Sequence, residues 1–207
     1  MRLNFDPSGY SVEIPDAIAK LTEEFKSGMM DSSELLHLAG TLALYPWNGD
    51  AILVEIGAYI GQTTVFMAKA LRLLGKQAPI LSIDPFERAK PDPINPQGIY
   101  SAYLKNTRAN HVEDTCLPLV AFSEHAAPVV PEKIGVLVID GSHRYEDVTK
   151  DLKLYVPKLL PGGLVFIDDY VAAYPGVMRA VDGNDSLENL AVVQKTYFFV
   201  GQRAFIS

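Results

Sequence analysis

The chain has 207 residues, of which 48% are hydrophobic, so it is long enough for one substantial core and short for two full domains. Its formal net charge is −7 and it contains no run of lysine and arginine, which argues against non-specific binding to nucleic acid. Cys116 is the single cysteine, which excludes an internal disulfide and fits a reducing compartment.

The N-terminal stretch MRLNFDPSGYSVEIPD lacks the pattern of a secretion signal, and no apolar run reaches membrane-spanning length. We therefore expect a soluble, cytoplasmic protein that makes no membrane contact.

The first fifty residues are predicted to be helical. Asp31 and Glu34 have the spacing of a capping box, which marks the start of a helix. The apolar residues that follow recur at helical spacing, namely Leu35, Leu36, Leu38, Ala39, Leu42 and Ala43. We expect residues 1–50 to form an N-terminal helical cap on a larger domain, residues 51–207, in one compact unit. The cap could cover a site or contribute to a homodimer or larger homo-oligomer.

From residue 51 onward, short apolar segments alternate with helical ones. Strands are predicted at 51–57 and 78–84 around a helix at 63–75, and then at 117–123, 135–140 and 162–169, with a helix at 146–160 between the last two. Nearly continuous apolar strands alternating with helices indicate the α/β class, with a doubly wound, mostly parallel sheet covered on both faces. The stretch 190–200 contains no helix and predicts a C-terminal antiparallel hairpin.

A proline-rich segment, residues 85–100, interrupts this alternation. It leaves the C-terminal end of the second predicted strand, which is the ligand side of an open α/β sheet. We expect a substrate-facing loop here rather than a simple surface excursion.

The turn after the first strand of the sheet reads VEIGAYIGQTT and carries an acid beside two glycines, in the pattern E-x-G-x-x-x-G formed by Glu55, Gly57 and Gly61. A carboxylate at this position opposes a dinucleotide pyrophosphate and suits a nucleoside that carries a cationic sulfur and an ammonium group. Asp84 ends the next strand, where a carboxylate can accept hydrogen bonds from ribose hydroxyls. Alternatively, the glycines only permit tight packing and Asp84 caps a turn.

With these motifs the chain resembles the class I S-adenosylmethionine-dependent methyltransferases, over most of its length from about Ala51 onward. In that family the glycine turn lies under the methionine part of the cofactor, and the acid after the second strand binds its ribose. The segment AFSEHAA, residues 121–127, resembles the part that borders the adenine. The resemblance implies a Rossmann-like fold, S-adenosyl-L-methionine as cofactor, and cofactor-binding roles for Glu55, Gly57, Gly61, Asp84, Ser123, Glu124 and Asp140.

Three further acids are predicted to meet at one edge of the sheet. Asp140 ends one strand, and Asp168 and Asp169 end the next. Unpaired carboxylates brought together repel one another and raise one another's pKa values. A hard divalent cation removes that repulsion, and ligation by oxygen alone suits Mg²⁺. The alternative is that one or two of these aspartates cap helices or turns.

The motif IDGSHRYEDVTKDL…LLPGGLVFIDDY resembles the metal-dependent O-methyltransferases, most closely the sugar-modifying enzymes of antibiotic pathways and more distantly the catechol and caffeoyl types. By this resemblance Asp140, Asp168 and Asp169 bind Mg²⁺. Catechol-type enzymes carry a basic lysine three residues after the first of these aspartates, where this chain has His143. Sugar-modifying relatives can carry an acid two residues after it, where this chain has Ser142. His143 is therefore the candidate general base, or else a structural histidine bonded to a loop carbonyl.

These patterns together predict methyl transfer from S-adenosylmethionine to a hydroxyl of a small molecule, either a sugar or a phenolic natural product, with no nucleic acid partner. Three alternatives stay open: a metal-independent methyltransferase, a nicotinamide-dependent oxidoreductase, and a non-catalytic binding protein. The oxidoreductase is disfavoured because the third glycine of G-x-G-x-x-G is missing and Glu55 is present.

Overall fold

The computed structural model describes residues 1–26, 28–47, 49–87 and 98–205. A seven-stranded sheet in the order β5-β4-β3-β6-β7-β9-β8 forms its centre. The strands are β3 (Ile52–Ile56), β4 (Ile80–Asp84), β5 (Cys116–Val120), β6 (Ile134–Ile139), β7 (Leu159–Ile167), β8 (Leu190–Lys195) and β9 (Phe199–Arg203). The first five are parallel, whereas β9 pairs antiparallel with both β7 and β8. The predicted doubly wound sheet and its C-terminal hairpin are confirmed.

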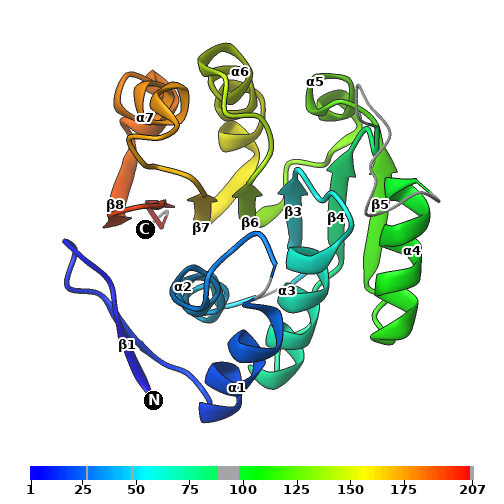
Figure 1. Cartoon of the computed structure of the whole chain (residues 1–207). Helices are drawn as coiled ribbons and strands as arrows, with labels where there is room; N and C mark the ends of the chain where they lie inside the picture. The colour runs from blue at the N-terminus through cyan, green and yellow to red at the C-terminus, as the bar shows by residue number, and fades with distance from the viewer. Residues whose placement is uncertain (27, 48, 88–97, 206–207) are drawn as a thin grey trace.

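Helices cover both faces of the sheet (Figure 1). On one face lie α1 (Asp16–Phe25), α2 (Ser32–Leu44), α3 (Gln62–Leu73) and α4 (Ile99–Ala109), and on the other α5 (Ser123–Ala126), α6 (Tyr145–Tyr155) and α7 (Pro175–Asp182). Strand β3 is buried along its whole length, and its side chains alternate between the two hydrophobic cores. This burial explains why β3 reads as a continuous apolar run interrupted by one acid.

The N-terminal region differs from the prediction. Residues 1–15 are not helical but form a small antiparallel hairpin of β1 (Arg2–Asn4) and β2 (Ser11–Glu13) before α1 begins. The sequence Asp-Pro-Ser-Gly between these strands is strong turn chemistry, which the helical reading overlooked. The predicted capping box is confirmed, because Asp31 accepts hydrogen bonds from the backbone N–H of Ser33 and Glu34 while Glu34 accepts one from the N–H of Asp31.

The helices α1 and α2 share a hydrophobic core with the sheet. Ile18 of α1 and Leu38 of α2 are fully buried and belong to the same cluster as Leu53 of β3 and Val136 of β6. The N-terminal helices therefore pack as one layer of the molecule. The division into a cap and a larger domain stays a prediction.

Two predicted elements were too long. The strand predicted at 117–123 ends at Val120, and Ser123 instead begins α5. The helix predicted at 146–160 ends at Tyr155 and gives way to a short 3-10 turn, Val156–Lys158, because Pro157 cannot donate the next helical hydrogen bond. Of the predicted loop 85–100, residues 88–97 lie outside the described residues, and α4 already begins at Ile99.

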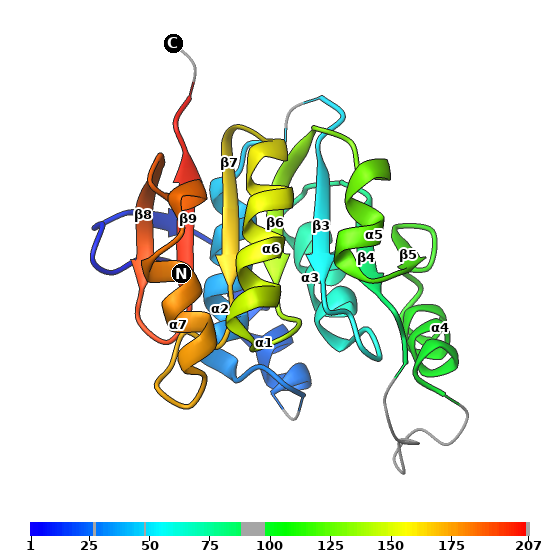
Figure 2. The ribbon, with the colours of Figure 1, turned by 90° about the horizontal axis from the view of Figure 1, so that it is seen from above.

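The parallel strands all end at one edge of the sheet, where the arrowheads of β3, β6 and β7 lie together in Figure 2. The chain order reverses between β3 and β6, because β4 and β5 extend the sheet to one side and β6 and β7 to the other. Open α/β sheets bind ligands at such a reversal point. None of the helices in the described ranges combines the length and apolar character needed to cross a membrane.

Candidate active site

A cavity of about 850 Å³ opens at this edge of the sheet. Its wall comes from the segments that follow β3, β4, β6 and β7, together with α5 and α6. Most of the residues predicted from the sequence line it, namely Gly57, Asp84, Ser123, Glu124, Asp140, His143, Asp168 and Asp169. Glu55 and Gly61 do not line it.

The two glycines are required by close packing. Gly57 has a φ of 93°, and a Cβ atom there would lie 2.6 Å from Cα of Gly141 and would clash with the backbone carbonyl of Asp140. Gly61 precedes α3 with a φ of 78°, and a Cβ there would lie 2.7 Å from the Tyr103 ring. The packing interpretation therefore accounts for both glycines. Because Gly57 has no side chain, part of the cavity wall there is bare backbone.

Glu55 lies beneath the cavity. Its side chain is fully buried and accepts hydrogen bonds from the hydroxyls of Thr64 in α3 and Ser82 in β4, while its Oε1 has no hydrogen-bond partner in the part of the chain that the structure describes. Burial raises the pKa of Glu55 to about 7. This carboxyl group ties the first turn of α3 to the sheet and is not among the residues that line the cavity, so its predicted contact with a cofactor stays a prediction.

Asp84 caps two turns, and its predicted contact with a ribose stays a prediction. Its Oδ2 accepts the backbone N–H of Tyr59 at 2.8 Å and its Oδ1 accepts that of Phe86 at 2.5 Å. Tyr59 and Phe86 both have positive φ, at 47° and 53°, so Asp84 stabilises two tight turns. Each carboxylate oxygen has a second lone pair, which leaves Asp84 able to accept hydrogen bonds from a ligand in the cavity.

Ser123 and Glu124 at the start of α5 are held by α6. The hydroxyl of Ser123 donates to Asp151, whose burial raises its pKa to about 6, and Glu124 is ion-paired with Lys150. Sequence reasoning missed Lys150 and Asp151, which both line the cavity. Together with Asp147 they have helical i, i+3, i+4 spacing along α6, and this periodicity could have indicated that they share one face.

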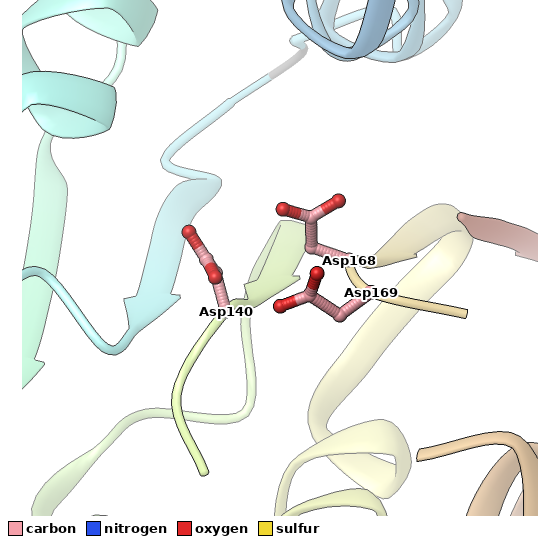
Figure 3. A group of neighbouring side chains, drawn as sticks. All are labelled: Asp140, Asp168 and Asp169. Atoms are coloured by element: carbon pink, nitrogen blue, oxygen red, sulfur yellow. The ribbon is translucent and has the colours of Figure 1, made fainter. Parts of the chain in front are cut away.

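The structure brings Asp140, Asp168 and Asp169 together. Each offers a carboxylate oxygen, and these three atoms lie within 4.8 Å of one another at the ends of β6 and β7 (Figure 3). Asp168 is only 6% exposed, and its Oδ1 has no hydrogen-bond partner among the described residues. Burial, followed by the charges of Glu34 and Asp169, raises the pKa of Asp168 to about 7. Burial also raises the pKa of Asp140. Metal binding at this trio stays a prediction.

His143 is held against this trio. Its Nε2 lies 2.7 Å from Oδ2 of Asp169, and its ring packs on that of Tyr174 with centroids 3.9 Å apart. Asp169 has a φ of 58°, a left-handed conformation that aspartate tolerates better than most residues. The structural alternative for His143 expected a loop carbonyl as partner, but the partner found is a carboxylate.

Two further cavity residues escaped the sequence reasoning. Tyr174 stands just before α7, and Met29 lies in the connection between α1 and α2 with 74% of its surface exposed. Both lie outside the strand ends, where the search for site residues was concentrated. Neither has a local pattern that marks it as part of a site.

A protein-family model described as a methyltransferase domain matches residues 54–170. The chain is 26% identical over 151 residues to an uncharacterised protein of Acanthamoeba polyphaga mimivirus, in a match that covers 70% of this chain and 64% of that one. It is 30% identical over 137 residues to 8-demethyl-8-(2,3-dimethoxy-alpha-L-rhamnosyl)-tetracenomycin-C 4'-O-methyltransferase of Streptomyces olivaceus, covering 57% of this chain and 52% of the relative. The chain thus spans less than two thirds of either relative.

Among solved structures, that of the O-methyltransferase NovP superimposes with a TM-score of 0.71 at 19% identity, over 90% of this chain and 88% of NovP. This similarity shows the fold, which is the Rossmann-like fold of methyltransferases.

Proposed function

Because the chain belongs to the methyltransferase-domain family whose model matches residues 54–170, we propose that it transfers the methyl group of S-adenosylmethionine to a hydroxyl of a small molecule, with a divalent cation at Asp140, Asp168 and Asp169. The resemblance to sugar-modifying enzymes suggests a sugar or phenolic acceptor. The name of the relative from Streptomyces olivaceus assigns 4'-O-methylation of a rhamnosyl compound to that protein, which supports the same acceptor class here.

The observation that carries the proposal is Oδ1 of Asp168, which has no hydrogen-bond partner within the described ranges. A buried carboxylate oxygen without a hydrogen bond is costly, and a second and third acid within 4.8 Å make it costlier. Magnesium ions bind carboxylate oxygens and retain open positions for further oxygen ligands. The residues present therefore fit a hard divalent cation. Such an ion supplies positive charge that lowers the pKa of a bound hydroxyl.

The other half of the cavity fits the cofactor. Gly57 presents backbone without a side chain, Asp84 retains lone pairs that can accept ribose hydroxyls, and Ser123 and Glu124 border the region expected for adenine. The volume of the cavity is within the range for a bound organic ligand. The cofactor supplies the methyl group on a sulfonium centre. Glu55 would support this region from below through Thr64 and Ser82.

His143 is the group best placed to take up the hydroxyl proton. Its imidazole is oriented by Asp169 on one side and Tyr174 on the other, at the rim of the three-acid cluster. With a cation held by the three acids, the ring nitrogen of His143 that carries no proton would be the acceptor for the hydroxyl proton. Proton uptake by a positioned histidine typically contributes a factor of about 10² to 10⁴ in rate.

A specific observation favours one competing function, a methyltransferase that uses no metal. His143 already contacts Asp169, so a protonated imidazole would neutralise part of the acid cluster without any ion. In that case the cavity would still bind the cofactor, and positioning of the acceptor would be the main source of catalysis.

The deciding experiment measures binding of the demethylated cofactor and of Mg²⁺ by calorimetry, in the wild type and in Asp168→Asn. The proposal predicts cofactor binding in both proteins and Mg²⁺ binding in the wild type alone. Asp50→Asn is the matched control, because Asp50 is an exposed aspartate paired with Lys133 away from the cavity. Equal Mg²⁺ binding by Asp168→Asn, or activity that survives a chelator, would favour the metal-free alternative. Tighter binding of a nicotinamide dinucleotide would favour an oxidoreductase, and binding of neither cofactor a non-catalytic protein.

A further inference from the structure

Helix α4 contacts two turns at the cofactor end of the cavity. The first, which we call the glycine turn, comprises residues 57–61 after β3, and the second, the Asp84 turn, comprises residues 84–86 at the end of β4. Four residues of these turns line the cavity, namely Gly57, Tyr59, Asp84 and Pro85. Of the residues of α4, all of which the structure describes, Ile99 alone lines it. The rest of α4 can therefore act on a ligand only through other segments.

The side chain of Asn106 in α4 holds the glycine turn. Its Nδ2 donates a hydrogen bond to the backbone carbonyl of Ile60 at 2.8 Å. Asparagine is a poorer residue than alanine for the interior of a helix, because its amide competes for backbone hydrogen bonds. The contact with Ile60 thus gives a reason for asparagine at this position that helix formation does not supply.

Tyr103 lies one turn earlier on the same side of α4. It is fully buried, and its ring lies so close to Gly61 that a Cβ atom there would be 2.7 Å from it. The same ring contacts that of Phe86 in the Asp84 turn, with centroids 5.1 Å apart. The backbone N–H of Phe86 is in turn bonded to Oδ1 of Asp84. Tyr103 therefore packs against both turns at once.

Both turns contain backbone that needs such support. Tyr59 and Phe86 have positive φ, at 47° and 53°, and their N–H groups are both bonded to the carboxylate of Asp84. Positive φ in residues other than glycine is costly and persists only where surrounding contacts fix it. Asn106 holds the carbonyl of the residue that follows Tyr59. The ring of Tyr103 contacts Phe86 itself.

We propose that Tyr103 and Asn106 are positioning residues for the cofactor, which keep the glycine turn and the Asp84 turn in the arrangement that binds it. This inference rests on the function proposed above, because it requires a cofactor at these turns. A site that already has its bound arrangement loses less conformational freedom on binding and binds more tightly. Without the contacts of α4, only a fraction of the molecules has this arrangement, and the apparent dissociation constant rises by the inverse of that fraction.

The variant Asn106→Ala tests the contact with the glycine turn. It removes the hydrogen bond to Ile60 and leaves α4 at least as helical, since alanine is the better helix former. Its dissociation constant for the demethylated cofactor, measured by calorimetry, should rise about two- to tenfold, as expected for one lost hydrogen bond. Asn110→Ala is the matched control on the same helix, because the amide of Asn110 donates to the carbonyl of Asn106 and not to the turn.

Two variants of Tyr103 test the contact of its ring. Tyr103→Phe keeps the ring against Gly61 and Phe86, and no hydrogen-bond partner of the lost hydroxyl is found in the described part of the chain. Its affinity for the demethylated cofactor should equal that of the wild type. Tyr103→Leu removes the ring and should weaken binding about tenfold or more. If Tyr103→Leu does not fold, the comparison of Asn106→Ala with Asn110→Ala decides the proposal.

Hydrogen exchange separates positioning from a contact made in the bound state. Without cofactor, the backbone amides of residues 57–61 should exchange faster in Asn106→Ala than in the wild type. With saturating demethylated cofactor the two proteins should exchange at the same rate, because the bound arrangement is the same. Unchanged affinity in Asn106→Ala, or an equal loss in Asn110→Ala, would overturn the proposal. So would a loss in Tyr103→Phe as large as that in Tyr103→Leu.

The wild type separates the two levels of inference. If it does not bind the demethylated cofactor, the proposed function fails, and the role of α4 with it. If the wild type binds the demethylated cofactor and Asn106→Ala binds it equally well, only the role of α4 is wrong.

Discussion

Nε2 of His143 lies 2.7 Å from Oδ2 of Asp169, so the candidate base and one of the candidate metal ligands hold each other in place. An ion that binds Asp169 would share this carboxylate with the imidazole. Metal affinity should therefore depend on the identity of residue 143, and base function should depend on the metal.

The first prediction concerns His143. Replacement by asparagine removes the proton acceptor but keeps a polar side chain, so kcat should fall by about 10² to 10⁴ while the affinity for the demethylated cofactor changes little. Single-turnover rates and calorimetry would measure the two quantities. His111→Asn is a suitable control, because His111 is exposed and does not line the cavity. A small effect on kcat with weakened Mg²⁺ binding would instead assign His143 to metal positioning.

The second prediction concerns Asp168. Its pKa is raised to about 7, so the folded protein binds this proton more tightly than the unfolded chain, and stability without metal falls as pH rises between about 4 and 7. Asp168→Asn has no carboxyl group to ionise at this position. In a chelator its melting temperature should therefore be higher than that of the wild type at pH 8 and nearly equal to it at pH 4. Added Mg²⁺ should stabilise the wild type alone. If Asp168→Asn is less stable than the wild type at pH 8 in a chelator, the ionised carboxylate of Asp168 is not destabilised by its burial and its acidic neighbours, and the prediction is wrong.

The third prediction concerns Glu55, and tests whether its side chain only stabilises the fold or also contacts the cofactor. Its pKa of about 7 lies above that of an unfolded glutamate, so its contribution to stability is present below about pH 4.5 and is lost as pH rises through 7. Glutamine keeps an acceptor for Thr64 and Ser82 and removes the buried charge. Glu55→Gln should thus be more stable than the wild type at pH 8, by up to about 3 kcal/mol, whereas Glu55→Ala should be less stable.

Denaturation in urea at pH 5 and pH 8 would measure this difference, with Glu113→Gln as the exposed control. Cofactor affinity is the second measurement. Because Glu55 does not line the cavity, Glu55→Gln should bind the demethylated cofactor as the wild type does. A loss of tenfold or more in affinity, which is about 1.4 kcal/mol, would show that Glu55 contacts the cofactor.

The fourth prediction concerns Gly57. A methyl group there meets the backbone of Asp140 and Gly141, so Gly57→Ala must push β3 and β6 apart at their ends. We expect a loss of about 3 kcal/mol or more in stability, together with weaker cofactor and metal binding. Gly75→Ala is the control, since Gly75 also has a positive φ, of 66°, but a Cβ atom there would meet nothing within 4 Å. If both variants lose the same stability, the cost comes from backbone strain and not from the close approach.

The strands were predictable, but their ends were not located closely enough to give the direction of each side chain. Glu55 and Asp140 look alike in the sequence, as acids that follow an apolar run. Glu55 still belongs to β3, whose alternation turns it toward α3, whereas Asp140 is one residue beyond β6 and faces the cavity. A shift of one residue at a strand end decides between core and site, and sequence patterns do not locate strand ends so closely.

Contacts between loops that are distant in the chain could also not be predicted from the sequence. Tyr174 meets His143 because the segments after β6 and β7 fold over the same edge of the sheet, and Met29 reaches the cavity through the packing of α1 and α2. Such contacts depend on tertiary structure and leave no periodic signal. By contrast, β6 and β7 could be predicted because burial on both faces requires an almost unbroken apolar run.

The buried residues that α1 and α2 share with β3 and β6 limit how this scaffold could be re-engineered. Exchanging the first fifty residues for those of a relative, in order to graft a new acceptor preference, would also replace a large part of a shared hydrophobic core. New preferences would be reached more safely by point substitutions in the connection between these helices, at positions such as Met29 that line the cavity, than by transplanting the helices as a module.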